Sequence, residues 1–404
     1  SVSDDTIGEF FEESLELSKD DIETYLGEDS DYDEVLFVIF HAGTGQDISF
    51  PYFDPTNYDI PSAYIEDSML STISENSWIY QNNIVRGIVM PETLNHIYYD
   101  IVEDLFYGVN DYCDYQIGMT GLFSLLIGYA LDFPPLYNTD NGRAGVGVFG
   151  LMDYGSNNGY GVIPSLPSPW TRIYNNWASS TYAETGENIL DSQIQRIDIA
   201  IDEYLLLENR NNWIFENVDI DSLRNKHKIW SDSYQDSIPG HFFDILTSKM
   251  GSHISVDPDT DVILSFDSYD YGLPGSGIVI WDINASLIDE DFLSTGINNS
   301  ADSKAIQIKE ADGSMDIGFE CYHWNPSFCD ILNRGWEYDM WYNNNESYFI
   351  NNPNQNNVIL NDESNPNLKS DLGALSLIQI DNFSDIDTQM SFSVSENEWG
   401  EIEY

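Results

Sequence analysis

The sequence predicts an α+β protein whose second half is rich in β-strands. Residues 119–131 are apolar and have the length of a helix, while residues 35–40 are an apolar run typical of a buried strand. After residue 178, short apolar or alternating segments separated by turn residues predict further strands. With 404 residues, of which 42% are hydrophobic and 14% aromatic, the chain is long enough for more than one packed core.

The first 34 residues are acidic and partly helical. The stretch FFEESLELSKDDIETYL carries apolar residues at helical spacing. An acidic turn follows, in which Asp29, Asp31 and Asp33 alternate ahead of the strand at 35–40. Alternating carboxylates on a short loop are typical of calcium ligands, although this turn lacks the glycine and the terminal glutamate of an EF-hand. We expect either a calcium ion here or a solvated acidic turn.

The histidines argue against a helical zinc site. Residues 84–107 predict a strand and then an amphipathic helix around His96. No two histidines lie within one helical turn of each other, so no helix can present a histidine pair to zinc. A zinc site would have to combine histidines from separate segments. The six are His41, His96, His227, His241, His253 and His323.

Residues 119–131 predict a buried helix without catalytic groups. Leu125 and Leu126 offer no donor atom for zinc, and the phenol of Tyr129, with an ordinary pKa of about 10, is a poor replacement for imidazole. Hydrolysis by a metalloprotease also needs a carboxylate to take a proton from the metal-bound water. Asp132 is the carboxylate at this corner, and we expect it to end the helix or to occupy a turn.

Glycine and asparagine dominate residues 138–162, which predicts tight irregular loops. The spacing of Gly145, Gly147 and Gly150 matches a dinucleotide-binding fingerprint, but no strand precedes it and no helix follows, so we discount it. The change to strand-like segments with turn residues after residue 178 suggests a domain boundary near 178. The expected domains are therefore 1–178 and 179–404, the second with an insertion-like region at 217–260.

Two segments of the second domain carry binding candidates. Glu310, Asp312 and Asp316 are oxygen donors around a glycine turn, which predicts a calcium site or a capped turn with solvated acids. Residues 321–370 are rich in Trp, Tyr and Asn, as carbohydrate or protein contact surfaces are, or as the buried aromatics of a β-domain would be. The segments at 375–380 and 390–394 predict two strands at the edge of a sandwich.

Five spaced motifs resemble the immune inhibitor A family of secreted zinc metalloproteases, over roughly residues 29–320. They are HAGTG at 41–45, PPLY at 134–137, Met152, DYGLPGSGIVIW at 270–281 and EADGSMDIG at 310–318. The resemblance implies a zincin-like first domain. It also places the family's two zinc histidines on Leu125 and Tyr129, its general-base glutamate on Leu126 and its third ligand on Pro135. The resemblance therefore implies a degenerate member, and no zinc is expected.

Charge and cysteine usage limit the partners. The chain has 70 acidic and 14 basic residues, a formal net charge of −56, so it repels nucleic acids and anionic membranes. No apolar run reaches the roughly 18–20 residues of a membrane helix. Cys321 and Cys329 are close enough in sequence to form a disulfide in an extracellular compartment, with Cys113 left as a buried thiol.

These observations predict a catalytically inactive metalloprotease homologue that is secreted or exposed on the cell surface. We expect it to bind protein partners or to self-assemble, with calcium as the stabilising ion. Two alternatives stay open at this stage. One is a hydrolase with a relocated site that uses Asp132, His96 or His41, and the other is a carbohydrate-binding surface protein.

Overall fold

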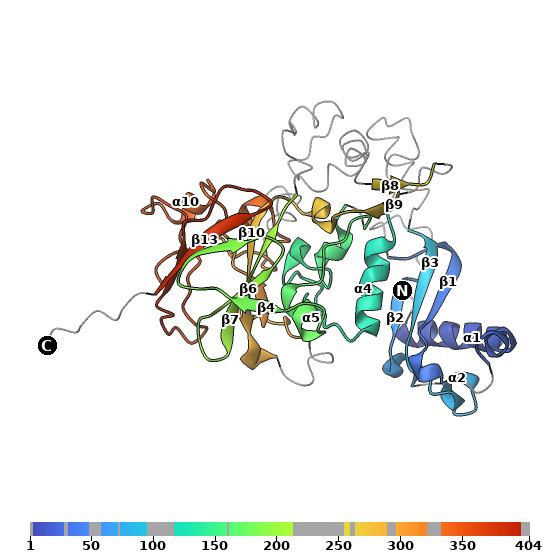
Figure 1. Ribbon diagram of the computed structural model, residues 1–404. Helices are drawn as coiled ribbons and strands as arrows, with labels where there is room; N and C mark the ends of the chain where they lie inside the picture. The colour runs from blue at the N-terminus through green and yellow to red at the C-terminus, as the bar shows by residue number, and fades with distance from the viewer. Residues whose placement is uncertain are drawn as a thin grey trace. The chain divides into compact units, whose positions relative to one another are not determined.

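A computed structural model shows that the protein contains both helices and sheets, as expected for the α+β class (Figure 1). The structure describes residues 3–27, 31–47, 58–71, 73–94, 117–159, 161–212, 254–258, 263–288, 296–320 and 333–396. The chain divides into two compact units, Ser1–Asp132 and Phe133–Tyr404. Among the described helices, none has the length and apolar character needed to cross a membrane.

The first unit is built on a three-stranded sheet with the order β1-β3-β2, in which β1 is parallel and β2 antiparallel to β3. Its elements are α1 (Asp4–Leu26), β1 (Phe37–Thr44), β2 (Ala63–Ile65), α2 (Trp78–Gln81), β3 (Gly87–Thr93) and α4 (Thr120–Ala130). The predicted helix at 119–131 and the predicted strand at 35–40 are therefore present, with bounds shifted by one to four residues.

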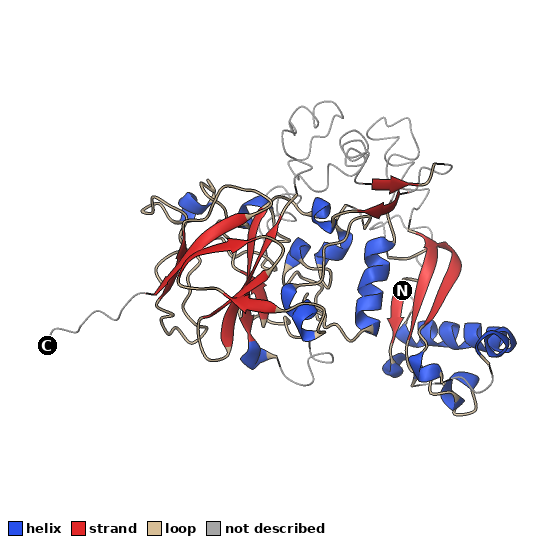
Figure 2. Ribbon diagram, in the orientation of Figure 1, coloured by secondary structure: helices blue, strands red, loops and turns tan. Residues whose placement is uncertain are grey.

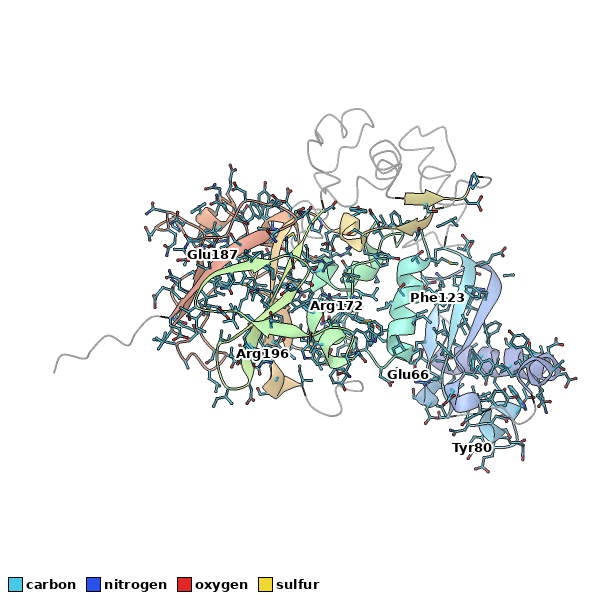
Figure 3. All side chains as sticks on the ribbon, viewed as in Figure 1. Glu66, Tyr80, Phe123, Arg172, Glu187 and Arg196 are labelled. Carbon is cyan, nitrogen blue, oxygen red and sulfur yellow. The ribbon has the colours of Figure 1, made fainter. Side chains whose placement is uncertain are left out.

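Helices cover both faces of this sheet. Phe11 of α1 is fully buried in one apolar cluster with Val89 of β3, whereas Leu126 of α4 is buried in another cluster with Ile88 and Met90. Consecutive residues of a strand point to opposite faces, so α1 and α4 lie on opposite sides of β3. Phe123, labelled in Figure 3, belongs to the second cluster, and its ring centroid lies 6.2 Å from that of Phe40.

The second unit contains two larger sheets and a two-stranded ribbon (Figure 2). The first sheet has the order β11-β10-β7-β6-β4, and the second has the order β12-β13-β5. Its strands are β4 (Ser180–Tyr182), β5 (Gly186–Leu190), β6 (Ile194–Asp198), β7 (Glu203–Arg210), β8 (Ile254–Val256), β9 (Ile263–Phe266), β10 (Gly277–Asn284), β11 (Ile306–Ile308), β12 (Ile378–Asp381) and β13 (Met390–Glu396). Its short helices are α5 (Pro169–Tyr174) and α10 (Tyr348–Asn351).

The two sheets share one apolar core. Leu207 of β7, Ile280 of β10 and Phe392 of β13 are all fully buried in a single cluster, together with Trp341 from the connection after β11. The longest strand pair, β7 with β10, is antiparallel and in register from Gly277 opposite Arg210 onward. The strands predicted at 375–380 and 390–394 are β12 and β13, which pair with each other.

Residues 133–178 belong to the second unit, which differs from the boundary near 178 that the sequence suggested. Asn298 donates to the carbonyl of Leu136 at 2.8 Å, and Arg172 of α5 pairs with Glu208 of β7. A Cβ on Gly150 would lie 3.6 Å from the Trp281 ring. Residues 133–178 therefore pack on the β11-β10-β7-β6-β4 sheet of the second unit, which explains why they fold with the strands that follow them.

Several predicted features lie outside the described residues. These are Asp29, His96, all three cysteines, most of the insertion-like region at 217–260 and the aromatic segment at 321–332.

The loop around Gly147 offers a test of the second unit's packing. Gly147 has a φ of 64°, and a Cβ there would lie 1.9 Å from the carbonyl oxygen of Arg334. We expect Gly147→Ala to lower the free energy of unfolding by about 3 kcal/mol or more. The backbone at Arg334 must move away from the new Cβ, and the alanine must also adopt a strained φ. Gly142→Ala is the matched control, since its φ is 73° but nothing lies within 4 Å of its Cβ. It should cost only about 1 kcal/mol in urea unfolding, and equal losses for both variants would contradict the close approach.

Candidate metal centre

Three buried carboxylates come together in the second unit from two segments of the chain. Glu310 and Asp312 follow β11, and Asp339 lies in a short 3-10 helix, η8 (Glu337–Asp339). One oxygen of each carboxylate lies within 4.8 Å of the others. The amide of Ala311 donates to the carbonyl of Asp339 at 2.9 Å, which holds the two segments side by side.

The turn after Glu310 wraps around its side chain. The amides of Asp316 and Ile317 donate to the two Glu310 oxygens, at 2.8 and 3.1 Å. Gly313 has a φ of 77°, and a Cβ there would lie 2.5 Å from the carbonyl oxygen of Asn365, so the turn requires glycine. The glycine turn seen in the sequence therefore serves to close the loop around a carboxylate.

Backbone and indole donors orient the other two carboxylates. Asp312 accepts from the amide of Ser314 at 2.9 Å and from the indole of Trp336 at 3.3 Å. Asp339 accepts from the amide of Trp336 at 2.8 Å through Oδ2. Trp336 thus contacts both aspartates, and its position links the two segments a second time.

These acids lack the partners that buried charges need. Oδ1 of Asp339 and Oδ1 of the adjacent Asp316 are buried without a hydrogen-bond partner. Among the residues that the structure describes, no Lys or Arg nitrogen lies within 4 Å of Glu310, Asp312, Asp316 or Asp339 as an ion pair. Buried charges that are neither paired nor metal-bound are costly, so this arrangement calls for a proton or a cation.

The pKa values of these four acids are raised because their negative charges are buried close together. Burial, and then the neighbouring carboxylates, raise the pKa of Glu310 and of Asp339 well above the ordinary range of a carboxyl group. Burial and the charge of Asp312 raise the pKa of Asp316 to about 7. Burial also raises the pKa of Asp312. A divalent cation would stabilise the ionised forms and relieve the repulsion among them.

The donor set fits a hard cation. It consists of carboxylate oxygens, the ligands that calcium and magnesium prefer, and it contains no thiolate or imidazole. Asp339 is only 1% exposed, and its Oδ1 accepts no hydrogen bond from the described residues. This oxygen is therefore suited to bind an ion. Glu310, Asp312 and Asp339 are therefore the residues that would hold a cation.

The sequence motif predicts only part of this cluster. The glycine turn points to Glu310 and Asp312, but it groups Asp316 with them rather than Asp339. Asp316 donates its amide to Glu310 and leaves its own Oδ1 unpartnered, without being one of the three clustered ligands. No local signal marks Asp339, because it meets the turn through long-range contacts, which are made by Ala311 and Trp336.

The acidic turn before β1 shows no comparable assembly among its described parts. Asp31 is exposed, and Asp33 lies in a short 3-10 helix, Tyr32–Glu34. Asp29 lies outside the described residues, so the predicted calcium site there stays a prediction.

The positions aligned with zinc ligands are packed as part of two cores. Leu126 is buried against β3, Leu125 is half-buried, and the ring centroid of Tyr129 lies 5.9 Å from that of Tyr64. Pro135 is buried in the second unit. Leucine and proline side chains have no donor atom, so these residues do not fit zinc.

Two residues considered for a relocated active site have structural contacts. His41 is within hydrogen-bond distance of the carbonyls of Ala42 and Ile60, at 3.1 Å each. Asp132 follows α4 with a φ of 60°, a left-handed conformation, and its amide donates to Tyr129. Its predicted place at the end of the helix is therefore confirmed.

Another buried carboxylate, Asp153, lies under the glycine loop at 145–147. Oδ2 of Asp153 accepts from the amides of Gly145, Val146 and Gly147, at 2.7 to 2.8 Å, and its Oδ1 accepts from the amide of Tyr154. Burial raises the pKa of Asp153 to about 6, while these four amides oppose the rise. The glycine spacing that mimics a dinucleotide fingerprint thus forms a loop around the protein's own carboxylate.

The described residues thus form an α+β protein in which three buried carboxylates from two segments lie together. Comparison with models of known protein families gives no match, and comparison with curated proteins gives none either.

The pKa of Asp153 predicts a pH effect of definite sign. Its folded pKa of about 6 exceeds its ordinary value of 3.8, so the folded state favours the protonated form. Its contribution to stability is present below about pH 4 and is lost as the pH rises through about 6. The stability of the native protein minus that of Asp153→Asn should therefore increase from pH 7 to pH 4, by up to about 3 kcal/mol. Urea unfolding of both proteins at each pH measures this difference, and a constant difference would contradict the raised pKa.

Proposed function

We propose that this protein is a non-catalytic binding or structural protein whose second unit is stabilised by a divalent cation, with calcium as the best fit. The observation that carries the proposal is the buried cluster of Glu310, Asp312 and Asp339 with its orphaned oxygen. Calcium tolerates irregular oxygen cages, whereas magnesium demands near-octahedral geometry and keeps several waters.

The cation would join parts of the second unit that are distant in sequence. Its ligands come from the turn after β11 and from η8, and Trp341 shortly after η8 enters the shared core of the two sheets. A cation that fixes η8 therefore also supports the core. With a net charge of −56, the chain gains further from any bound dication because self-repulsion falls.

A zincin-like ancestry of the first part belongs to the same proposal. It rests on the sequence motifs and agrees with a helix, α4, packed along a mixed sheet that contains a parallel pair. At the position of the general base, Leu126 is a core side chain, so this position cannot supply the carboxylate that takes a proton from a zinc-bound water. A secreted or surface-exposed protein that binds partners or assembles with itself is the role we infer.

Cation dependence is tested by thermal unfolding of chelator-treated protein with and without calcium chloride. At a calcium concentration of about 100 times Kd, binding adds about 2.7 kcal/mol, which raises the Tm by several degrees. Asp339→Asn should lose most of this rise, because it removes a ligand and its charge. Asp302→Asn is the control, since Asp302 is exposed and outside the cluster, and it should keep the full rise. An unchanged Tm of the native protein in calcium and in chelator would contradict the cation site.

The non-catalytic assignment is tested by metal analysis and peptidase assays of the purified protein. We expect no stoichiometric zinc and no chelator-sensitive cleavage of unfolded protein substrates. The variant Leu126→Glu restores the general-base residue type but no zinc ligand, so it too should be inactive. Stoichiometric zinc together with chelator-sensitive cleavage by the native protein would show that the assignment is wrong.

A further inference from the structure

A lysine is buried beside the candidate metal centre. Lys304 is 5% exposed, and its Nζ donates to the carbonyl oxygen of Ile317, in the turn that wraps around Glu310. A Cβ added to Gly318 would lie 3.3 Å from this nitrogen. The ammonium group is therefore packed against the backbone of the turn rather than extended into solvent.

The charge of Lys304 acts on both groups of buried acids. It interacts electrostatically with Glu310 and Asp316 at the metal centre, and with Asp153 under the glycine loop. No ion pair within 4 Å joins it to these acids in the described part of the chain. Lys304 is thus close enough to offset their charge while leaving their oxygens available to a ligand.

We propose that Lys304 is the internal counter-charge of the cation site: it holds the turn at 310–318 in place without a cation, and it lowers the affinity of the site for a divalent cation. This inference rests on the proposed function, since it concerns the regulation of the same site. Lys304 is a positioning residue and not a ligand, because an ammonium group has no lone pair to give to a metal.

The two effects of Lys304 have opposite signs. A dication and an ammonium group repel each other, and this repulsion is only weakly screened inside a protein. Removing the ammonium group therefore strengthens cation binding. The same change leaves the acids less compensated and removes the hydrogen bond to Ile317, so the protein without a cation becomes less stable. A lysine with a merely structural role would behave differently, because its loss would loosen the site and weaken binding.

The test uses the full chain, stripped of metal by chelation, with the variants Lys304→Met, Lys304→Gln and Lys304→Arg. Calcium binding is measured by titration calorimetry and by competition with terbium, whose luminescence Trp336 can excite because it contacts Asp312 and Asp339. We expect calcium to bind roughly tenfold more tightly to the Met and Gln variants, with a lower Tm in chelator. The Arg variant, which keeps the charge, should bind within about threefold of the native protein.

Lys369→Met is the matched control, because it removes one positive charge from a half-buried lysine elsewhere in the same unit and should leave the calcium Kd unchanged. Should the Met and Gln variants be unfolded in chelator, we expect calcium to refold them, and failure to refold would overturn the inference. Equal or weaker calcium binding by both variants would also overturn it while leaving the proposed cation site intact. Absence of calcium binding by the native protein would instead reject the proposed function.

Discussion

Desolvation of negative charge is the constraint on which the second unit depends. Two groups of acids in its sheets and loops are largely withdrawn from water, and each group must neutralise its charge locally. In the first, Glu208 and Asp270 share the two guanidinium groups of Arg172 and Arg210. Burial alone would raise the pKa of Glu208, but Arg172 and Arg210 lower it below the ordinary value. Two acids and two bases balance there, and Arg172, labelled in Figure 3, fastens α5 to β7 as a result.

The second place contains Glu310, Asp312, Asp316 and Asp339, and its charges do not balance. Lys304 is the basic residue beside it, and the pKa values of all four acids are raised. The acids are buried to a similar extent in the two places. The opposite pKa shifts therefore arise because, among the described residues, arginine pairs with the first group and not with the second. Arginine balances the first group, whereas the second keeps an excess of negative charge, and the proposed cation site rests on this contrast.

Local patterns in the sequence predicted elements well and assembly poorly. The apolar run at 119–131 identifies α4, and the segments at 375–380 and 390–394 identify β12 and β13. The oxygen donors at Glu310 and Asp312 stood out because a glycine turn joined them. Asp339 did not, since its role depends on a backbone contact between Ala311 and Asp339, which are separated by 27 intervening residues. The division at Asp132 was missed for the same reason, because only the packing of residues 133–178 on the first sheet assigns them to the second unit.

The order of elements in the first unit has a consequence for synthesis on the ribosome. Its sheet is flanked by α1, which is made first, and by α4, which is made last. When β3 has emerged, α1 can already cover one face, whereas α4, the described helix that packs on Ile88 and Met90, emerges about 30 residues later. During that interval this apolar face lacks its contacts with α4. Chaperone binding to stalled chains of increasing length should therefore drop once α4 has left the exit tunnel.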